Sequence, residues 1–392
     1  MVLAKPAILL LTDFYLPGYK GGGPIRTLAS MVHILGDEYH LSIITRDRDL
    51  GDTGPYPGIK VNAWQKVGKA EVFYVSPENI TLRYLRCLIN STDYDTLYLN
   101  SFFSPGFTII PQLLLRLGLI QKKTTIVAPR GQFSPGALKI KMIKKRLYIY
   151  LSKQIGLYRN TVWHASSVYE ARDIKAVMDK VVVSIASNLV VIAPDLSIPK
   201  LPERGLDQKE KKTGNLRVVF LSRISPMKNL DGALRMLQGL RGEIVFNIYG
   251  PLEDEKYWKN CQRIIDTLPS NIKVHYKGPI GYEKVAEVFS DNDLFFLPTH
   301  GENYGHAIIE ALVSGCPVLI SDQTPWRDLA TEGVGWDISL SQPERFTNIL
   351  QLCVDMGNDD LCSLSRQARE YGITKSIDQE LVRQNRELLN QR

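Results

Sequence analysis

Acidic residues are absent from one long stretch of this 392-residue sequence. From Thr96 to Tyr169 there is no Asp or Glu, but there are eleven Lys or Arg residues, five of them in Lys139 to Arg146. The net charge is accordingly +11 over residues 1–200 and −4 over residues 201–392. Apolar and aromatic residues interleave with the cations of Lys139 to Arg146. This pattern is typical of a helix on an anionic membrane surface, and a solvated helix face is the simpler alternative.

Several other features are missing. No nucleic-acid-binding motif accompanies the basic residues, so nucleic acid is not an expected partner. The five cysteines are an odd number without a CxxC pair, which favours a reducing cytoplasm over a disulfide framework or a zinc site. No uninterrupted run of about 20 apolar residues predicts a membrane-spanning helix. We therefore expect a cytoplasmic protein, peripheral on the inner face of the plasma membrane if the basic segment binds lipid.

Apolar runs of strand length alternate with amphipathic helical stretches along the chain. This alternation is typical of parallel sheets with helices on both faces. Residues 196–214 interrupt it with prolines, glycines and charges, and are predicted to be a linker. We expect doubly wound α/β domains at 1–195 and 215–372, and a helix at 373–392 that returns to the first domain. The predicted strands are Ala7 to Leu11, His40 to Thr45, Thr96 to Leu99, Thr124 to Ala128, Thr161 to His164, Leu189 to Ile192, Arg217 to Leu221, Glu243 to Tyr249, Ile272 to Lys277, Asp293 to Leu297 and Pro317 to Ser321.

The stretch from Leu297 to Ile320, LPTHGENYGHAIIEALVSGCPVLI, predicts a strand, a glycine-bearing turn, a helix and a second strand. Glu302 lies in the turn and Glu310 in the helix, so their carboxylates can contact different parts of one extended ligand. The helix start suits a phosphate, because its first N–H groups lack intrahelical acceptors. Arg223 and Lys228 follow the first strand of the same half and could neutralise a diphosphate. Alone, either would be interpreted as a solvated loop charge.

These residues resemble the donor domain of retaining glycosyltransferases of family 4, whose GT-B fold has two Rossmann-like domains facing each other across a cleft. The resemblance rests on Glu302-x7-Glu310 with Arg223-x4-Lys228 and covers most of residues 215–330. It implies that Glu310 binds the ribose of a nucleotide sugar. It also implies catalytic roles for Glu302, beside the donor sugar, and for Arg223 and Lys228, on the leaving diphosphate. The further donor contacts that it implies are Gly22, Gly23, Ile280, Asn303, Tyr304, Gly305, His306 and Ala307.

The N-terminal half resembles the family less closely. Its loop YKGGGPIR follows the first strand. In the family such a loop closes on the diphosphate and the acceptor, whereas a plain flexible turn is the alternative. Arg130 stands where related enzymes frequently have a histidine that contacts the donor sugar, and both acceptor or phosphate binding and a structural role stay open for it. No chemical role is expected for the His306 imidazole, and His164 is expected to be a hydrogen-bonded core residue.

The resemblance implies transfer of a hexose-type sugar from a UDP- or GDP-sugar to an acceptor hydroxyl, with retention of configuration. The expected acceptor is a glycan or lipid-linked intermediate of cell-surface polysaccharide synthesis. No DxD-type metal motif lies in the relevant loop, since Asp291 to Asp293 is predicted to be a helix-to-strand turn, so neither a metal nor another cofactor is expected. An epimerase on the same fold and a non-catalytic nucleotide-sugar-binding protein are the alternatives. The oligomeric state is not predicted.

Overall fold

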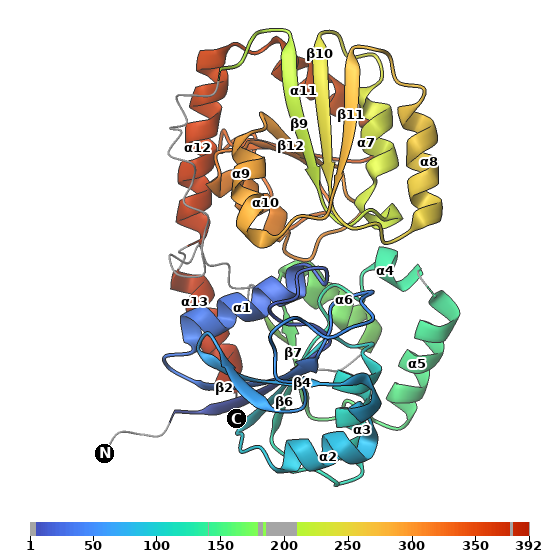
Figure 1. Ribbon diagram of the computed structural model, residues 1–392, viewed down its shortest axis with the longest axis vertical. Coiled ribbons are helices and arrows are strands. Elements are labelled where there is room, and N and C mark those ends of the chain that lie inside the picture. Colours follow the sequence, from blue (N-terminus) through green and yellow to red (C-terminus); the bar gives the residue numbers. More distant parts are fainter. Residues whose placement is uncertain (1–4, 140, 179–182, 186–209, 377–378, 392) are drawn as a thin grey trace. The chain divides into compact units, whose positions relative to one another are not determined.

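Two separate sheets of mostly parallel strands organise the chain in the computed structural model (Figure 1). The structure describes residues 5–139, 141–178, 183–185, 210–376 and 379–391. The chain divides into unit 1, residues 1–191 with 378–392, and unit 2, residues 192–377. The predicted α/β fold with two wound sheets is confirmed. The predicted strand Leu189 to Ile192 and most of the predicted linker lie outside the described residues.

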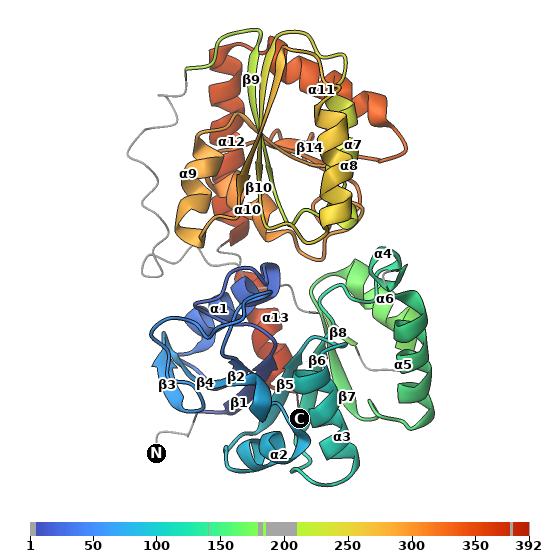
Figure 2. The same cartoon turned by 45° about the vertical axis from the view of Figure 1, so that its right-hand side comes forward.

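Unit 1 contains an eight-stranded sheet in which the described strand pairs are parallel, except for the antiparallel pair β3–β4. Strands such as β1 are almost continuously apolar, because helices cover both faces (Figure 2). In sheet order the strands are β3 (Trp64–Val67), β4 (Ala70–Val75), β2 (His40–Arg46), β1 (Ala7–Thr12), β5 (Thr96–Asn100), β6 (Thr124–Ala128), β7 (Thr161–Ala165) and β8 (Val183–Ile185). The helices are α1 (Gly23–Leu35), η1 (Pro77–Asn79), α2 (Leu82–Asn90), η2 (Pro105–Ile109), α3 (Ile110–Arg116), α4 (Pro135–Lys139), α5 (Met142–Gln154), α6 (Val168–Met178) and α13 (Gln379–Leu389).

Helix α13 joins unit 1 from the far end of the sequence. Leu388 and Leu389 are buried in the same apolar cluster as residues of β1, β2 and α1. Tyr39 donates a hydrogen bond to Asn390 (Oη to Oδ1, 3.1 Å), and Arg386 forms an ion pair with Glu38 at 2.7 Å. Of the helix predicted over residues 373–392, the structure describes the end of α12, up to Ser376, and α13 from Gln379.

Unit 2 contains a six-stranded sheet whose described pairs are all parallel. In sheet order its strands are β11 (Ile272–Gly278), β10 (Glu243–Tyr249), β9 (Asn215–Leu221), β12 (Leu294–Leu297), β13 (Val318–Ser321) and β14 (Gly335–Ile338). The helices are η4 (Pro226–Lys228), α7 (Leu230–Leu237), α8 (Glu255–Ile265), η5 (Tyr282–Lys284), α9 (Val285–Ser290), α10 (His306–Val313), α11 (Pro343–Asp355) and α12 (Asn358–Ser376). α12 packs closely on α10 at Gly372, where an added Cβ would stand 2.6 Å from the backbone nitrogen of Val313. No helix among the described residues has the length and apolar content needed to cross a membrane.

Candidate functional site

The chain reverses its direction of winding in unit 2 between β9 and β12. From β9 it proceeds through β10 to β11 on one side, and later through β12 and β13 to β14 on the other. Loops from two adjacent strands therefore leave the same edge of the sheet in opposite directions, and open α/β sheets bind ligands at such an edge. Lys228 follows β9 and Glu302 follows β12, so both predicted residues lie at this point.

Hydrogen bonds hold the loops after β9 and β12 together. The carbonyl of Met227 accepts from the His300 backbone N–H at 2.8 Å and from the Thr299 hydroxyl at 3.0 Å. Asn229 donates from its side-chain amide to the Pro298 carbonyl at 2.8 Å. Since each of these groups bonds within the protein, both loops keep a defined position relative to the sheet.

The centre of the site is an ion pair between Lys228 and Glu302. Lys228 Nζ lies 2.5 Å from Glu302 Oε1, and the two side chains are only 10% and 18% exposed. An ion pair so far removed from water is stronger than a surface pair, because the local dielectric constant is lower. It places a cation beside the loop that leads into α10.

Helix α10 begins with a glycine turn. Gly305 precedes it with φ 83° and ψ 59°, a left-handed conformation that glycine adopts without strain. The turn is braced by Trp326, whose Nε1 donates to the carbonyl of Tyr304 at 2.6 Å. The N–H groups of the first helical turn, from His306 and Ala307, point out of the helix and give this end a partial positive charge. The turn thus has the geometry of an anion site, which Glu302 and Asn303 precede in sequence.

Two other residues predicted to bind the nucleotide sugar lie at the same edge of this sheet, whereas Gly22 and Gly23 belong to unit 1. Glu310 is half-buried on α10, and Ile280 is half-buried in the loop after β11. Arg223, however, does not contact Glu302. Its guanidinium forms an ion pair with Glu253 at 2.8 Å, with both side chains 41% exposed. The structure therefore brings Lys228 and Glu302 into contact and places Arg223 on the β10 side. The partner residue Glu253 and the brace Trp326 were not predicted from the sequence.

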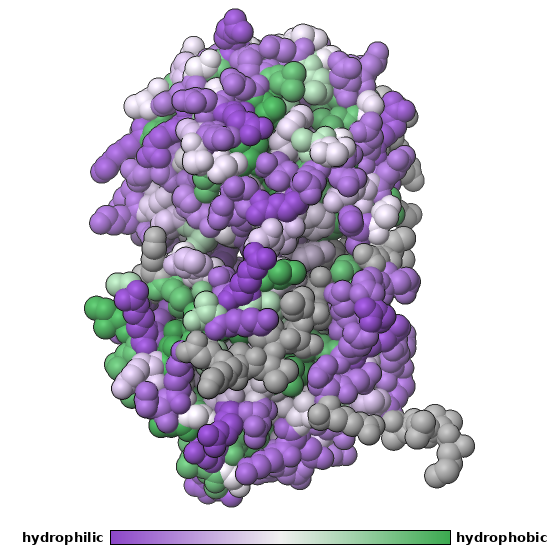
Figure 3. Space-filling model, turned by 180° about the vertical axis from the view of Figure 1, so that it is seen from behind, coloured by the Kyte–Doolittle hydropathy of each residue, from purple (hydrophilic) through white to green (hydrophobic). Residues whose placement is uncertain are grey.

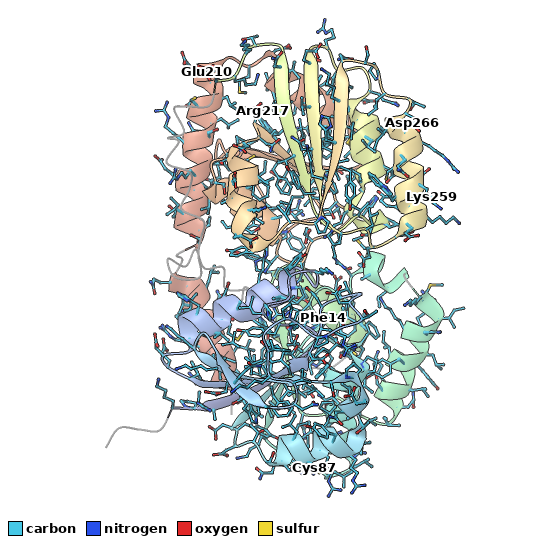
Figure 4. The ribbon with its side chains drawn as sticks, in the orientation of Figure 1. Phe14, Cys87, Glu210, Arg217, Lys259 and Asp266 are labelled. Carbon is cyan, nitrogen blue, oxygen red and sulfur yellow. The ribbon has the colours of Figure 1, made fainter. Side chains whose placement is uncertain are left out.

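The acidic turn before β12 has a structural role. Asp293 is buried and accepts hydrogen bonds from the backbone N–H of Arg217 at 2.8 Å and from its guanidinium at 2.7 Å. Arg217 lies near the start of β9, and β12 begins after Asp293, so this pair joins the amino ends of the two strands (Figure 4). Within the described ranges, no group of three or more His, Cys, Asp or Glu side chains is arranged to hold a metal ion.

The glycine loop of unit 1 is held by a buried aspartate. Asp49 accepts hydrogen bonds from the backbone N–H groups of Tyr19 and Lys20, at 2.7 and 3.0 Å. Gly22 has φ 71° and stands just before α1, and an added Cβ there would meet open space. Asp49 therefore anchors the beginning of the loop, and Gly22 supplies the positive-φ conformation that precedes the helix.

Arg130 joins a polar network at the carboxyl ends of β5 and β7. Its guanidinium donates to the side-chain oxygens of Asn100 and Tyr98, each at 2.7 Å. The Tyr98 hydroxyl also lies 2.5 Å from Nδ1 of His164, which is buried, as expected for a hydrogen-bonded core residue. Burial raises the pKa of Tyr98 to about 12. Arg130 therefore has a structural role in unit 1.

Two carboxylates of α6, Glu170 and Asp173, lie next to this network. Glu170 accepts from the backbone N–H of Gly131 at 2.6 Å and from the hydroxyl of Ser166 at 2.7 Å. Asp173 is one turn further along α6, and burial together with the charge of Glu170 raises its pKa to about 6. The contact of Glu170 with Gly131 could not be predicted from the sequence, because these groups follow separate strands.

Known proteins resemble this chain over both units. Residues 203–374 match the family model described as glycosyl transferases group 1. An uncharacterized 41.2 kDa protein in the cps region of Klebsiella pneumoniae is 21% identical over 243 residues, which is 62% of this chain and 64% of that protein. D-inositol 3-phosphate glycosyltransferase of Streptomyces scabiei is 29% identical over 110 residues, or 26% of this chain and 25% of that protein. The chain thus covers less than two thirds of these curated relatives.

Solved structures agree in fold across nearly the whole chain. Anabaena Alr3699/HepE in complex with UDP and glucose superposes with a TM-score of 0.66 at 16% identity, covering 98% of each chain. WaaG, a glycosyltransferase involved in lipopolysaccharide biosynthesis, gives 0.65 at 15% identity, over 98% of this chain and 100% of that one. Residues 203–374 are therefore similar to the glycosyl transferases group 1, in a chain that has the GT-B fold.

Proposed function

We propose that this protein transfers a hexose-type sugar from a UDP- or GDP-sugar to an acceptor hydroxyl, with retention of anomeric configuration. The observation that carries the proposal is the shielded pair of Lys228 and Glu302 at the β9–β12 switch point, beside the start of α10. This edge combines a cation, a helix N-terminus and two carboxylates, which are the groups that a sugar linked to a nucleoside diphosphate requires.

Each predicted residue has a role in this proposal. Lys228 and Arg223 stabilise the leaving diphosphate. Backbone N–H groups of the turn that precedes α10, and of the first turn of α10, contribute to this stabilisation. Glu310 accepts hydrogen bonds from the ribose hydroxyls, and the loop at Ile280 contacts the base. Glu302 lies beside the donor sugar. The Anabaena structures were solved with UDP and with UDP-glucose, which supports a uridine nucleotide as the first donor to test.

The proposed reaction needs no protein nucleophile. The bond between the anomeric carbon and the diphosphate oxygen breaks, a bond to the acceptor oxygen forms on the same face, and the acceptor proton passes to the departing phosphate oxygen. Lys228 and the N–H groups at the start of α10 offset the charge that develops on the diphosphate. We propose that this charge stabilisation takes the place of a metal ion.

The acceptor proposal rests on the printed descriptions of similar proteins. One relative lies in a cps region, and one structural neighbour acts in lipopolysaccharide biosynthesis. We therefore propose a glycan or lipid-linked intermediate of a cell-surface polysaccharide, processed at the cytoplasmic face of the membrane. Arg130 of unit 1 and the glycine loop at Gly22 and Gly23 are the first candidates for acceptor contacts.

Thermal stabilisation by UDP- and GDP-sugars tests the donor, because a ligand that binds the folded state raises Tm. Stabilisation should be followed by slow donor hydrolysis and by faster release of the nucleotide once an acceptor is added. Chelation with EDTA should leave both rates unchanged. Conversion of the donor to its epimer without nucleotide release would favour the epimerase alternative, and binding without any turnover would favour the non-catalytic one. If no nucleotide sugar stabilises the protein, the proposal is wrong.

A further inference from the structure

Helix α5 of unit 1 exposes a row of large apolar side chains. Ile143 is 79% exposed, and Leu147, Tyr150 and Leu151 are each at least half exposed. Their spacing of four, seven and eight residues from Ile143 places them on one face of the helix. Figure 3 shows hydrophobic residues gathered on the surface of unit 1 where α5 lies. Soluble proteins rarely expose such a contiguous apolar strip, and one of this kind usually marks a site of interaction with a membrane or another molecule.

The opposite face of α5 accounts for the packing of the helix. Tyr148 and Ile149 pack against the core of unit 1, and Ser152 is buried. Tyr148 also shares a hydrogen bond of 2.6 Å with the hydroxyl of Tyr158. The exposed row is therefore an additional apolar face and not the side by which the helix joins the fold.

The basic segment Lys139 to Arg146 spans the junction of two helices. α4 ends at Lys139 and α5 begins at Met142, with Lys141 in a left-handed conformation at φ 53°. Lys145 turns inward, where its amine donates to the Ala137 carbonyl at 2.7 Å and lies 5.1 Å from the centre of the Phe103 ring. Lys145 is therefore excluded from the cations that could meet a surface ligand.

Exposed cations flank the apolar row. Lys144, Arg146 and Lys153 are all exposed on α5. The basic surface continues at the end of α3, where Arg116 donates to the carbonyl of Ile155 at 3.0 Å and the adjacent Leu117 is 64% exposed. Because no acidic residue occurs between Thr96 and Tyr169, no carboxylate of this segment neutralises these charges.

We propose that α5 lies flat in the interface of an anionic membrane, with Ile143, Leu147, Tyr150 and Leu151 inserted among the lipid chains and Lys144, Arg146 and Lys153 at the level of the headgroups. Apolar insertion combined with flanking cations matches an anionic lipid surface. A nucleic acid would use the cations and leave the aliphatic row in water. This proposal is independent of the sugar-transfer proposal, because membrane binding requires neither a donor nor turnover.

Flotation of the full chain with vesicles tests this surface. The protein should bind vesicles of phosphatidylcholine with phosphatidylglycerol, and bind much less to phosphatidylcholine alone. Replacing Lys144, Arg146 and Lys153 by glutamine should lower the partition coefficient roughly fivefold per cation, hence roughly a hundredfold together. Replacing Ile143, Leu147 and Leu151 by serine should also abolish flotation. Both variants should retain the Tm and the donor hydrolysis of the unchanged protein.

The matched control removes three exposed cations from a helix of unit 2, with Lys256, Lys259 and Arg263 of α8 changed to glutamine (Figure 4). This control should float as well as the unchanged protein. An equal loss of vesicle binding in the control and in the α5 charge variant would overturn the assignment of α5 as the membrane-binding helix. Failure of the unchanged protein to bind anionic vesicles would also overturn it. A concentration-dependent dimer in lipid-free solution that the serine variant abolishes would show that a second copy covers this face, and would also overturn it.

Discussion

The Lys228–Glu302 pair allows its structural and catalytic contributions to be separated. Lys228→Met leaves the carboxylate of Glu302, only 18% exposed, without its cation. The expected cost is about 2 kcal/mol of folding stability, since a shielded charge loses its partner. For a unit of this size that lowers Tm by about 4 to 8 °C. Glu302→Gln should cost about 1 kcal/mol, because its amide still accepts a hydrogen bond from the lysine.

The double variant decides between the two roles. Lys228→Met with Glu302→Gln removes both charges, so its stability should exceed that of Lys228→Met alone by about 1 kcal/mol. The activity of the double variant should not recover with its stability. Lys228→Met should lose about 10² to 10³ in kcat/KM, the usual effect of removing a group that stabilises transition-state charge, and the double variant should recover none of it. Thermal unfolding measures the stability of each variant. Nucleotide release, assayed below the lowest Tm of the set, measures kcat/KM.

A second ion pair in the same sheet serves as the control. Arg217 and Asp293 join β9 to the turn before β12 at the amino ends of these strands. Arg217→Met should lower Tm by a similar amount and leave kcat/KM nearly unchanged. The reasoning is refuted if the Lys228 and Glu302 double variant regains activity together with stability, or if Arg217→Met reduces kcat/KM as strongly as Lys228→Met does.

Three further predictions follow from the same structure. Glu310→Ala should weaken nucleotide binding roughly tenfold or more in calorimetry, and unchanged affinity would exclude the ribose contact. Gly305→Ala should destabilise the fold by about 1 to 2 kcal/mol and weaken donor binding, since φ is 83° and the new Cβ would lie 2.7 Å from Ile308 Cδ1; a neutral effect would exclude this turn geometry. Burial and the charge of Glu170 raise the pKa of Asp173 from 3.8 to about 6, so the folded state loses stability as the pH rises from about 4 to about 6 and stays less stable above that. Asp173→Asn should therefore stabilise by about 1 kcal/mol, discounted for partial exposure, near pH 7.5 but not near pH 4, and a pH-independent effect would contradict this.

Strands buried on both faces were predicted well from the sequence. The predicted bounds Thr124 to Ala128 and Glu243 to Tyr249 are those of β6 and β10. The hairpin of β3 and β4 was not predicted. β3 is a short, partly exposed edge strand whose sequence WQKV lacks an apolar pattern, whereas β4 has the buried, apolar sequence AEVFYV. Apolar continuity therefore predicted most interior strands and the edge strand β11, but it missed the interior strand β4.

The positions of the site residues were predictable to a greater extent than their contacts. Strand ends and turns place Lys228 and Glu302 at one edge of the sheet, since parallel strands share that edge. The pairing of Arg223 with Glu253 and the brace from Trp326 depend on side-chain geometry between separate loops. No local pattern carries that information. The same limit applies to Lys145, which belongs to a basic run in the sequence but faces Phe103 and a carbonyl in the structure.

The position of α13 has a consequence for the order of folding. Unit 2 is formed by residues 192–377, which the ribosome releases before α13. Until Leu388 and Leu389 emerge, the cluster around Tyr39 that they complete exposes apolar surface to water. The strands of unit 1 are therefore synthesised first, but its hydrophobic core is completed last. Unit 2 can complete its own core before unit 1 does. A released chain truncated after Ser376 should therefore have a protease-resistant unit 2 and a protease-sensitive unit 1.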